Sequence, residues 1–130
     1  MSLSVEDQLA IQQLYARYNH AIDFGRADEW AACFTADGVF SSGASGEFTG
    51  TEALSAFAKG FAERIKARHW INNLVLEASD EGAQGSCYLQ LLRLGGDTPA
   101  SILTTGVYED TLVCTPEGWK FVRRTVTPDA

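Results

Sequence analysis

Apolar side chains recur every three or four positions near the start of the chain. They form a stripe made of Ile11, Leu14, Tyr15, Tyr18 and Ile22. This spacing predicts an amphipathic helix over residues 5–23, with Ser4 positioned to cap its first turn and Gly25 positioned to end it. A short second helix is expected over residues 27–34.

A second apolar stripe follows in the middle of the chain. Its members are Leu54, Phe57, Ala58, Phe61 and Ile65, which predict a third helix over residues 51–68. Between the second and third helices, the turn signal Ala36-Asp37-Gly38 leads into a brief strand over residues 39–41 and a loop over 43–50.

The hydrophobic period changes to two beyond the third helix. Four alternating runs predict strands over residues 69–77, 83–94, 100–114 and 119–126, separated by Gly-containing turns. Three helices followed by an antiparallel meander indicate an α+β fold in which the helices cover one face of a strongly curved sheet. We expect residues 1–130 to form one domain.

Composition and charge exclude several classes of partner. The 130 residues are 45% hydrophobic and carry a formal net charge of −7, so neither nucleic acid nor a membrane surface is an expected partner. Cys33, Cys87 and Cys114 stand singly, which is typical of reduced, mostly buried thiols in a cytoplasmic protein. The N-terminus lacks the pattern of a signal peptide, and the sequence contains no metal-binding cluster.

Two polar residues 46 positions apart are the strongest candidates for chemistry. Asp23 closes the first helix, where a carboxylate faces the negative end of the helix dipole, and His69 begins the first long strand. If the fold brings them together, they form an imidazole oriented by a carboxylate, which is an acid/base device. The structural alternatives are an Asp23 bonded locally near Gly25 or Arg26 and a histidine without a catalytic role.

Further candidates surround this pair. Tyr18 lies on the apolar stripe and is a candidate donor to a substrate carbonyl, with Tyr15 as a weaker candidate for the same role. Asn73 shares a strand face with His69 if the strand is regular, which predicts polar groups at two depths of one cavity wall. His20 is expected to face solvent.

The later strands add candidate binding residues. Tyr108 and Asp110 share a face, whereas Arg123 and Arg124 point to opposite faces, so at most one arginine reaches a cavity without a bulge. That arginine is a candidate partner for an acidic substrate group. The remaining polar candidates are Tyr88 and Gln90, and the aromatic residues expected inside are Phe34, Phe40, Phe57, Phe61 and Trp70.

Several motifs together carry a resemblance to a known family. They are Tyr18-x-x-Ala21-x-Asp23, Trp30-x-x-Cys33-Phe34-x-x-Asp37-Gly38-Val39-Phe40, Arg68-His69-x-x-x-Asn73, Gly106-x-Tyr108-x-Asp110 and Gly118-Trp119-x-Phe121. The chain resembles the SnoaL-like branch of the NTF2-like superfamily, within which scytalone dehydratase and the bile acid 7α-dehydratases are most similar. The resemblance implies a cone-shaped cavity formed by the curved sheet and the three helices.

The resemblance also implies a function. It suggests a cofactor-independent dehydratase-like lyase or isomerase that uses Asp23, His69 and Tyr18 on a small, mostly apolar, ring-bearing carbonyl or hydroxy compound. The second histidine of scytalone dehydratase and the acidic residue of the bile acid enzymes are missing from residues 85–94. A polyketide-cyclase-like enzyme and a non-catalytic ligand-binding or dimerisation module therefore remain alternatives. An uncovered apolar sheet face predicts a homodimer.

Overall fold

The computed structural model describes residues 2–129, and its first helix has the predicted bounds. Helix α1 spans Val5–Asp23, and the Ser4 hydroxyl accepts a hydrogen bond of 3.0 Å from the Asp7 backbone amide at its start. The predicted apolar stripe is buried. Helix α2 is shorter than expected and covers Ala27–Ala31, because the chain enters a strand at Phe34.

The first strand is longer than predicted and has a partner that the sequence did not indicate. Strand β1 spans Phe34–Ser42, and the expected loop contains strand β2, Gly46–Thr49, which pairs with β1. Helix α3 covers Thr51–Arg64 and ends earlier than predicted, because Ile65 already has an extended conformation. The four later strands are β3 (Ala67–Ala78), β4 (Ala83–Gly95), β5 (Thr98–Thr115) and β6 (Gly118–Pro128).

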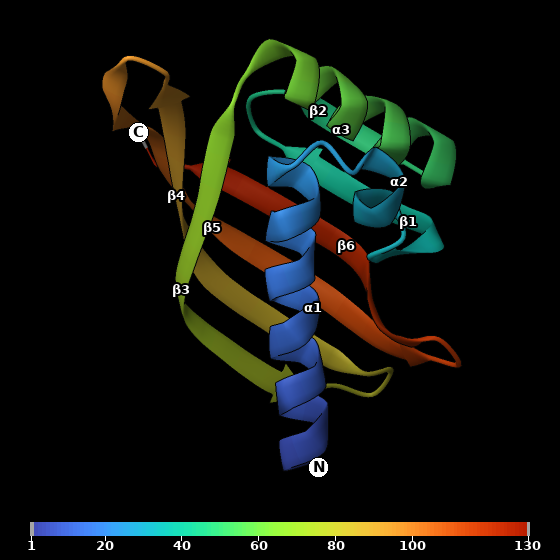
Figure 1. Ribbon diagram of the computed structural model, residues 1–130. Helices are drawn as coiled ribbons and strands as arrows, with labels where there is room; N and C mark the ends of the chain where they lie inside the picture. Colours follow the sequence, from blue (N-terminus) through green and yellow to red (C-terminus); the bar gives the residue numbers. More distant parts are fainter. Residues whose placement is uncertain (1, 130) are drawn as a thin grey trace.

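The strands form one curved sheet in the order β2-β1-β6-β5-β4-β3 (Figure 1). The meander from β3 to β6 is antiparallel as predicted, but β1 pairs with β6 in parallel, so the sheet is mixed at this position. The three helices lie on one side of the sheet. The predicted α+β fold is confirmed, and its core lies between the helices and the concave face.

Aromatic side chains dominate this core. Trp30 packs against Phe34, Phe40 and Phe57 with ring centroids 5.1–5.7 Å apart, and Tyr18 and Phe121 continue the cluster toward α1. Cys33 and Cys87 are buried in the same region, whereas Cys114 is exposed. Among residues 2–129, none of the helices combines the length and apolar character that crossing a bilayer requires.

Candidate functional site

Asp23 and His69 lie in contact. The Nδ1 atom of His69 is 2.6 Å from Oδ1 of Asp23, and the His69 backbone amide donates to both carboxylate oxygens at 3.1 and 3.0 Å. The side chains are 9% and 6% exposed, so the pair is largely shielded from water. The hydrogen bonds from the His69 amide also stabilise the Asp23 carboxylate, which lies at the negative end of the α1 dipole.

This geometry fixes the orientation and tautomer of the imidazole. An ionised carboxylate only accepts hydrogen bonds, so the proton of the neutral ring lies on Nδ1 and the lone pair on Nε2. The Phe61 ring, with its centroid 5.6 Å from that of the imidazole, packs against the ring and restricts its rotation. His69 therefore presents a basic nitrogen on the side opposite Asp23.

His69 opens onto an inner cavity of about 500 Å³ between the helices and the concave face of the sheet. The cavity is mostly apolar, and Phe40, Phe57, Leu89 and Leu91 form part of its wall. Its volume lies within the usual range of about 300–1,000 Å³ for small-molecule sites. Phe40, one of the aromatic residues expected inside, is buried in this wall, and its contact with a substrate stays a prediction.

Three fully buried side chains contribute polar groups to this wall. Tyr18 and Tyr108 line the cavity with His69, and burial raises the pKa of both hydroxyls, that of Tyr108 to about 12. Both phenols therefore stay protonated near neutral pH and can donate to a substrate oxygen. The third group is the indole of Trp30, whose Nε1–H is buried without a hydrogen-bond partner within residues 2–129.

The structure resolves which arginine of the last strand faces inward. Arg124 is fully buried, with its Nε 3.0 Å from Oδ1 of Asp110, while Arg123 is exposed and pairs with Glu47 at 2.8 Å. Arg124 does not contact the inner cavity. The geometry therefore does not support Arg124 as a partner for an acidic substrate group, because its guanidinium is already paired with Asp110.

Arg124 belongs to a buried charge network under the cavity. Its Cζ lies 3.5 Å from the centroid of the Tyr108 ring and 4.3 Å from that of Tyr18. The Tyr15 hydroxyl donates to Oδ2 of Asp110 at 2.6 Å, and Gly85 leaves the room that this hydroxyl needs. Tyr15, predicted as a weaker candidate for donating to substrate, therefore donates its hydroxyl proton to Asp110 instead.

The pKa shifts in the network have a common origin. Burial raises the pKa of the Asp110 carboxyl, while the Arg124 guanidinium and the Tyr15 hydroxyl, which both donate to it, oppose the rise. Burial alone would lower the pKa of Arg124, but the Asp110 carboxylate raises it, so the guanidinium keeps its charge. A permanent cation therefore lies directly beneath Tyr18 and Tyr108.

Asn73 does not share the wall of the inner cavity. A bulge in β3 shifts its register between Asn72 and Val75, and Asn73 adopts a left-handed backbone with φ of 57°. Asparagine tolerates this conformation better than most residues. Because the extra residue reverses the alternation, Leu74 and Leu76 turn inward while Asn73 is exposed. The prediction of polar groups at two depths of one wall is therefore wrong.

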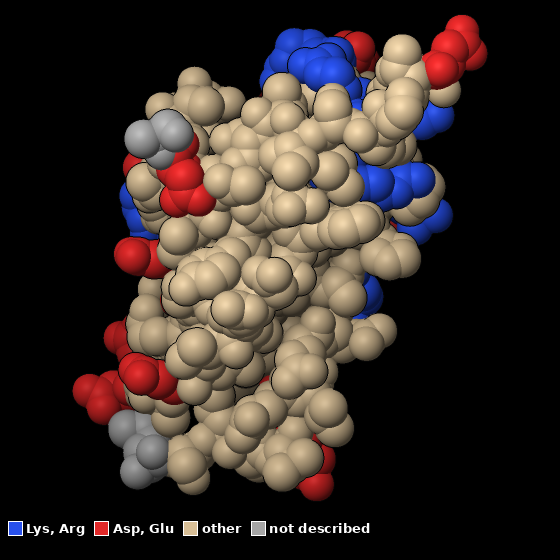
Figure 2. All heavy atoms as spheres, turned by 90° about the vertical axis from the view of Figure 1, so that its left-hand side faces the viewer, with Lys and Arg blue, Asp and Glu red and all other residues tan. Residues whose placement is uncertain are grey.

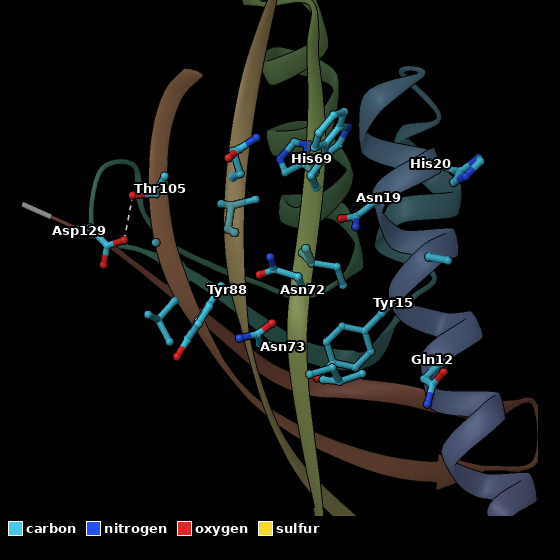
Figure 3. A pocket seen from close by; sticks show the side chains of 18 residues that line it. Gln12, Tyr15, Asn19, His20, His69, Asn72, Asn73, Tyr88, Thr105 and Asp129 are labelled. Carbon is cyan, nitrogen blue, oxygen red and sulfur yellow. Dashed lines mark hydrogen bonds between the residues drawn. The ribbon is translucent and has the colours of Figure 1, made fainter. Parts of the chain in front are cut away.

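Three other candidates lie on the outer face of the sheet. Tyr88 and Trp70 are 53% and 59% exposed, and Gln90 pairs with Trp70 across the strands. The prediction that Trp70 belongs to the interior is wrong, because the inward position of His69 forces its neighbour outward. Figure 3 shows Asn73 and Tyr88 on the side of β3 away from α1.

A second hollow, the outer groove, has a volume of about 1,200 Å³ and is lined by Trp70, Asn73, Tyr88 and Gln90. It extends around the edge strand β3 and is bounded by α1 on the other side, where Tyr15 and Asn19 lie (Figure 3). His20 also borders this groove and is exposed, as predicted. His69 borders both hollows, but the inner cavity is the better candidate site, because its wall adds buried donors and a mostly apolar surface.

Several residues of the inner cavity carry no functional signal in the sequence. Among them are Trp30, which the motifs mark only as an aromatic residue, and Arg64 and Arg93, which border the cavity from α3 and β4. No signal in the sequence connects Arg64 with Arg93, since they belong to elements that meet only in the folded chain.

Comparison with known proteins identifies relatives along almost the whole chain. A family model described as a SnoaL-like domain matches residues 3–125. Rv2910c, an uncharacterized protein of Mycobacterium tuberculosis, is 28% identical over 130 residues, covering 95% of this chain and 86% of the relative.

Two solved structures resemble the fold closely. A protein from Catenulispora acidiphila in complex with S-DNPA is 28% identical with a TM-score of 0.87, covering 97% of this chain and 96% of that one. An NTF2-like protein with a cystatin-like fold from Novosphingobium aromaticivorans is 23% identical with a TM-score of 0.88, covering 95% and 82%. The second likeness shows the fold alone.

Proposed function

Since the chain belongs to the SnoaL-like domain family, we propose that it is a cofactor-independent lyase or isomerase that removes a proton beside a carbonyl group. The observation that carries the proposal is the 2.6 Å contact between His69 and Asp23 at the wall of an apolar cavity. The expected substrate is a small ring-bearing carbonyl or hydroxy compound. The complex of the Catenulispora relative with S-DNPA supports ligand binding by this fold.

The proposed reaction begins at His69. Nε2 takes a proton from the carbon next to the carbonyl, and the electron pair moves onto the carbonyl oxygen as an enolate. The hydroxyl of Tyr18 donates a hydrogen bond to this oxygen, and the unpartnered Nε1–H of Trp30 is a second donor in the same wall. Asp23 stabilises the imidazolium that forms.

The imidazolium then returns its proton. Delivery to a departing hydroxyl completes a dehydration with release of water, whereas delivery to another carbon completes an isomerisation. Both outcomes are redox-neutral and need only proton transfer. Among the described residues, no Asp or Glu lines the inner cavity. We therefore assign the roles of base and acid both to His69, which favours reactions in which the two proton transfers occur on one face of the substrate.

Deuterium exchange tests the proposed proton transfer directly. We expect the protein in D2O to accelerate exchange of the protons beside the carbonyl across a panel of ring ketones such as 2-tetralone, followed by proton NMR. Replacing Tyr18→Phe removes one oxyanion donor and should slow exchange by about 10²–10³-fold. Tyr88→Phe is the matched control, because Tyr88 lies outside the cavity. A panel without enzyme-dependent exchange would contradict the proposal and leave the binding-module alternative.

We also propose that the chain forms a homodimer through the outer face of the sheet. Trp70 and Tyr88 are exposed together on this face, with Val107 beside Tyr88 in the pairing of β4 and β5. A twofold partner presents the same apolar surface and would cover it symmetrically. Light scattering at micromolar concentration should give about twice the 14.1 kDa chain mass. Trp70→Glu should give the monomer, whereas Leu9→Glu on α1 should leave the mass of the wild type.

A further inference from the structure

Two arginines border the opening of the inner cavity. Arg64 is the last residue of α3, and Arg93 lies near the end of β4, and both are exposed while lining the cavity that contains His69. The register of the sheet brings their elements together, because Arg93 pairs with Ala67 and the Leu94 amide donates to the Lys66 carbonyl at 2.9 Å. The two arginines therefore leave the backbone at the same end of the cavity that both of them line.

The charge around this opening differs from that of the rest of the molecule. The chain has 17 acidic and 10 basic residues, yet four of the basic ones, Arg64, Lys66, Arg68 and Arg93, fall in the short segments that meet here. Figure 2 shows Lys and Arg side chains gathered near the top, at the height at which α3 ends and β3 begins in Figure 1. Acidic side chains lie along the left edge and toward the bottom of the same view, and some also lie beside the basic group and at the upper right.

Neither cavity arginine forms an ion pair with a carboxylate of residues 2–129. By contrast, Arg123 and Arg124 are paired with Glu47 and Asp110. A guanidinium presents a planar set of N–H donors that matches the geometry of a carboxylate. The donors of Arg64 and Arg93 are therefore available to a ligand at the edge of the apolar inner cavity.

We propose that the substrate carries a carboxylate, which Arg64 and Arg93 hold at the opening of the inner cavity while its ring lies inside near His69. The inference rests on the proposed function for the location of the reacting end, and it adds the chemical class of the substrate. The apolar wall binds the ring through burial, and the arginines fix which end enters first. A carboxylate at the opening keeps its hydration on the solvent side, so its transfer avoids the penalty of full burial.

A matched pair of probes tests the proposal by binding alone. The probes are 4-(2-naphthyl)butanoate and its primary amide, which have nearly the same shape and differ in charge, and naphthyl fluorescence reports their affinity. We expect the carboxylate to bind about tenfold more tightly than the amide at low salt. This preference should shrink as sodium chloride rises from about 0.02 M to about 0.5 M, because the arginines are exposed to screening.

Charge-removing variants locate the preference. The double variant Arg64→Gln/Arg93→Gln should bind the two probes equally, while Arg123→Gln, an exposed arginine outside the cavity, should keep the preference of the wild type. Circular dichroism confirms that each variant is folded. Equal affinities in the wild type, or a preference that survives in the double variant, would overturn the proposal.

The outcome is independent of the proposed reaction. Binding of the probes requires no turnover, so His69→Ala should retain the carboxylate preference even though it lacks the proposed base. Loss of the preference in the arginine variants with continued deuterium exchange would support both claims. A carboxylate preference without any exchange would support the arginine site and contradict the reaction.

Discussion

Replacing His69→Ala is expected to lower the rate of enzyme-dependent deuterium exchange by about 10²–10⁴-fold, the usual contribution of a positioned general base. Among the described residues that line the inner cavity, no other can take a proton near neutral pH, because the remaining titratable groups are tyrosines and arginines. The variant should fold, since the Asp23 carboxylate keeps its two contacts with the backbone amide of residue 69. NMR exchange rates and a thermal melt measure the two effects together.

The other histidine provides the control for this experiment. His20 is exposed on α1, so His20→Ala should leave exchange unchanged. Asp23→Asn should also slow exchange, because an amide does not favour the Nδ1 proton that leaves Nε2 basic. A fully active His69→Ala variant would end the assignment of His69 as the base, whatever the behaviour of the Asp23 variant.

Replacing Arg124→Met is expected to reduce the free energy of unfolding by about 3–5 kcal/mol, because it leaves the Asp110 carboxylate buried without its cationic partner. Arg124 and Asp110 are 0% and 3% exposed, so water cannot replace the lost contact at 3.0 Å. Urea denaturation measures the effect. The same change at the neighbouring exposed position, Arg123→Met, should stay within about 0.5 kcal/mol of the wild type.

A second substitution separates loss of the pair from loss of packing. In Arg124→Met/Asp110→Leu both charges are gone, so much of the lost stability should return, as it does when buried ion pairs are replaced by apolar residues. Tyr15 then loses its acceptor, which limits the recovery. A double variant as unstable as Arg124→Met alone would show that stacking of the guanidinium on the tyrosines, rather than charge pairing, stabilises this part of the core.

Local patterns were sufficient to predict the main elements. The stripe of α1 and the Ser4 cap gave its bounds of Val5–Asp23, and the Gly-containing turns separated the four long strands. The errors occurred where tertiary pairing outweighs local preference. β1 runs on to Ser42 and is joined by β2 because it has partners on both sides, and Arg64 ends α3 because the chain must cross to β3.

The contact between Asp23 and His69 was also predictable, but its surroundings were not. A carboxylate at the end of a helix and a histidine at the start of a strand suggested a pair, and the family resemblance brought the two together. The bulge at Asn73 reverses the inward face of β3, and alternation along a strand carries no signal for such an insertion. The choice between Arg123 and Arg124 depended on the register opposite Asp110, which requires the folded sheet.

The contact of Asp23 with the backbone of β3 has a consequence for self-association through strand pairing. Strand β3 is an end strand of the sheet, and an end strand with a free row of amides and carbonyls can recruit the same strand from another molecule and start aggregation. Asp23 occupies the His69 amide, and the bulge at Asn73 interrupts the row four residues later. The same carboxylate that orients the imidazole thus protects the sheet against fibre-like stacking.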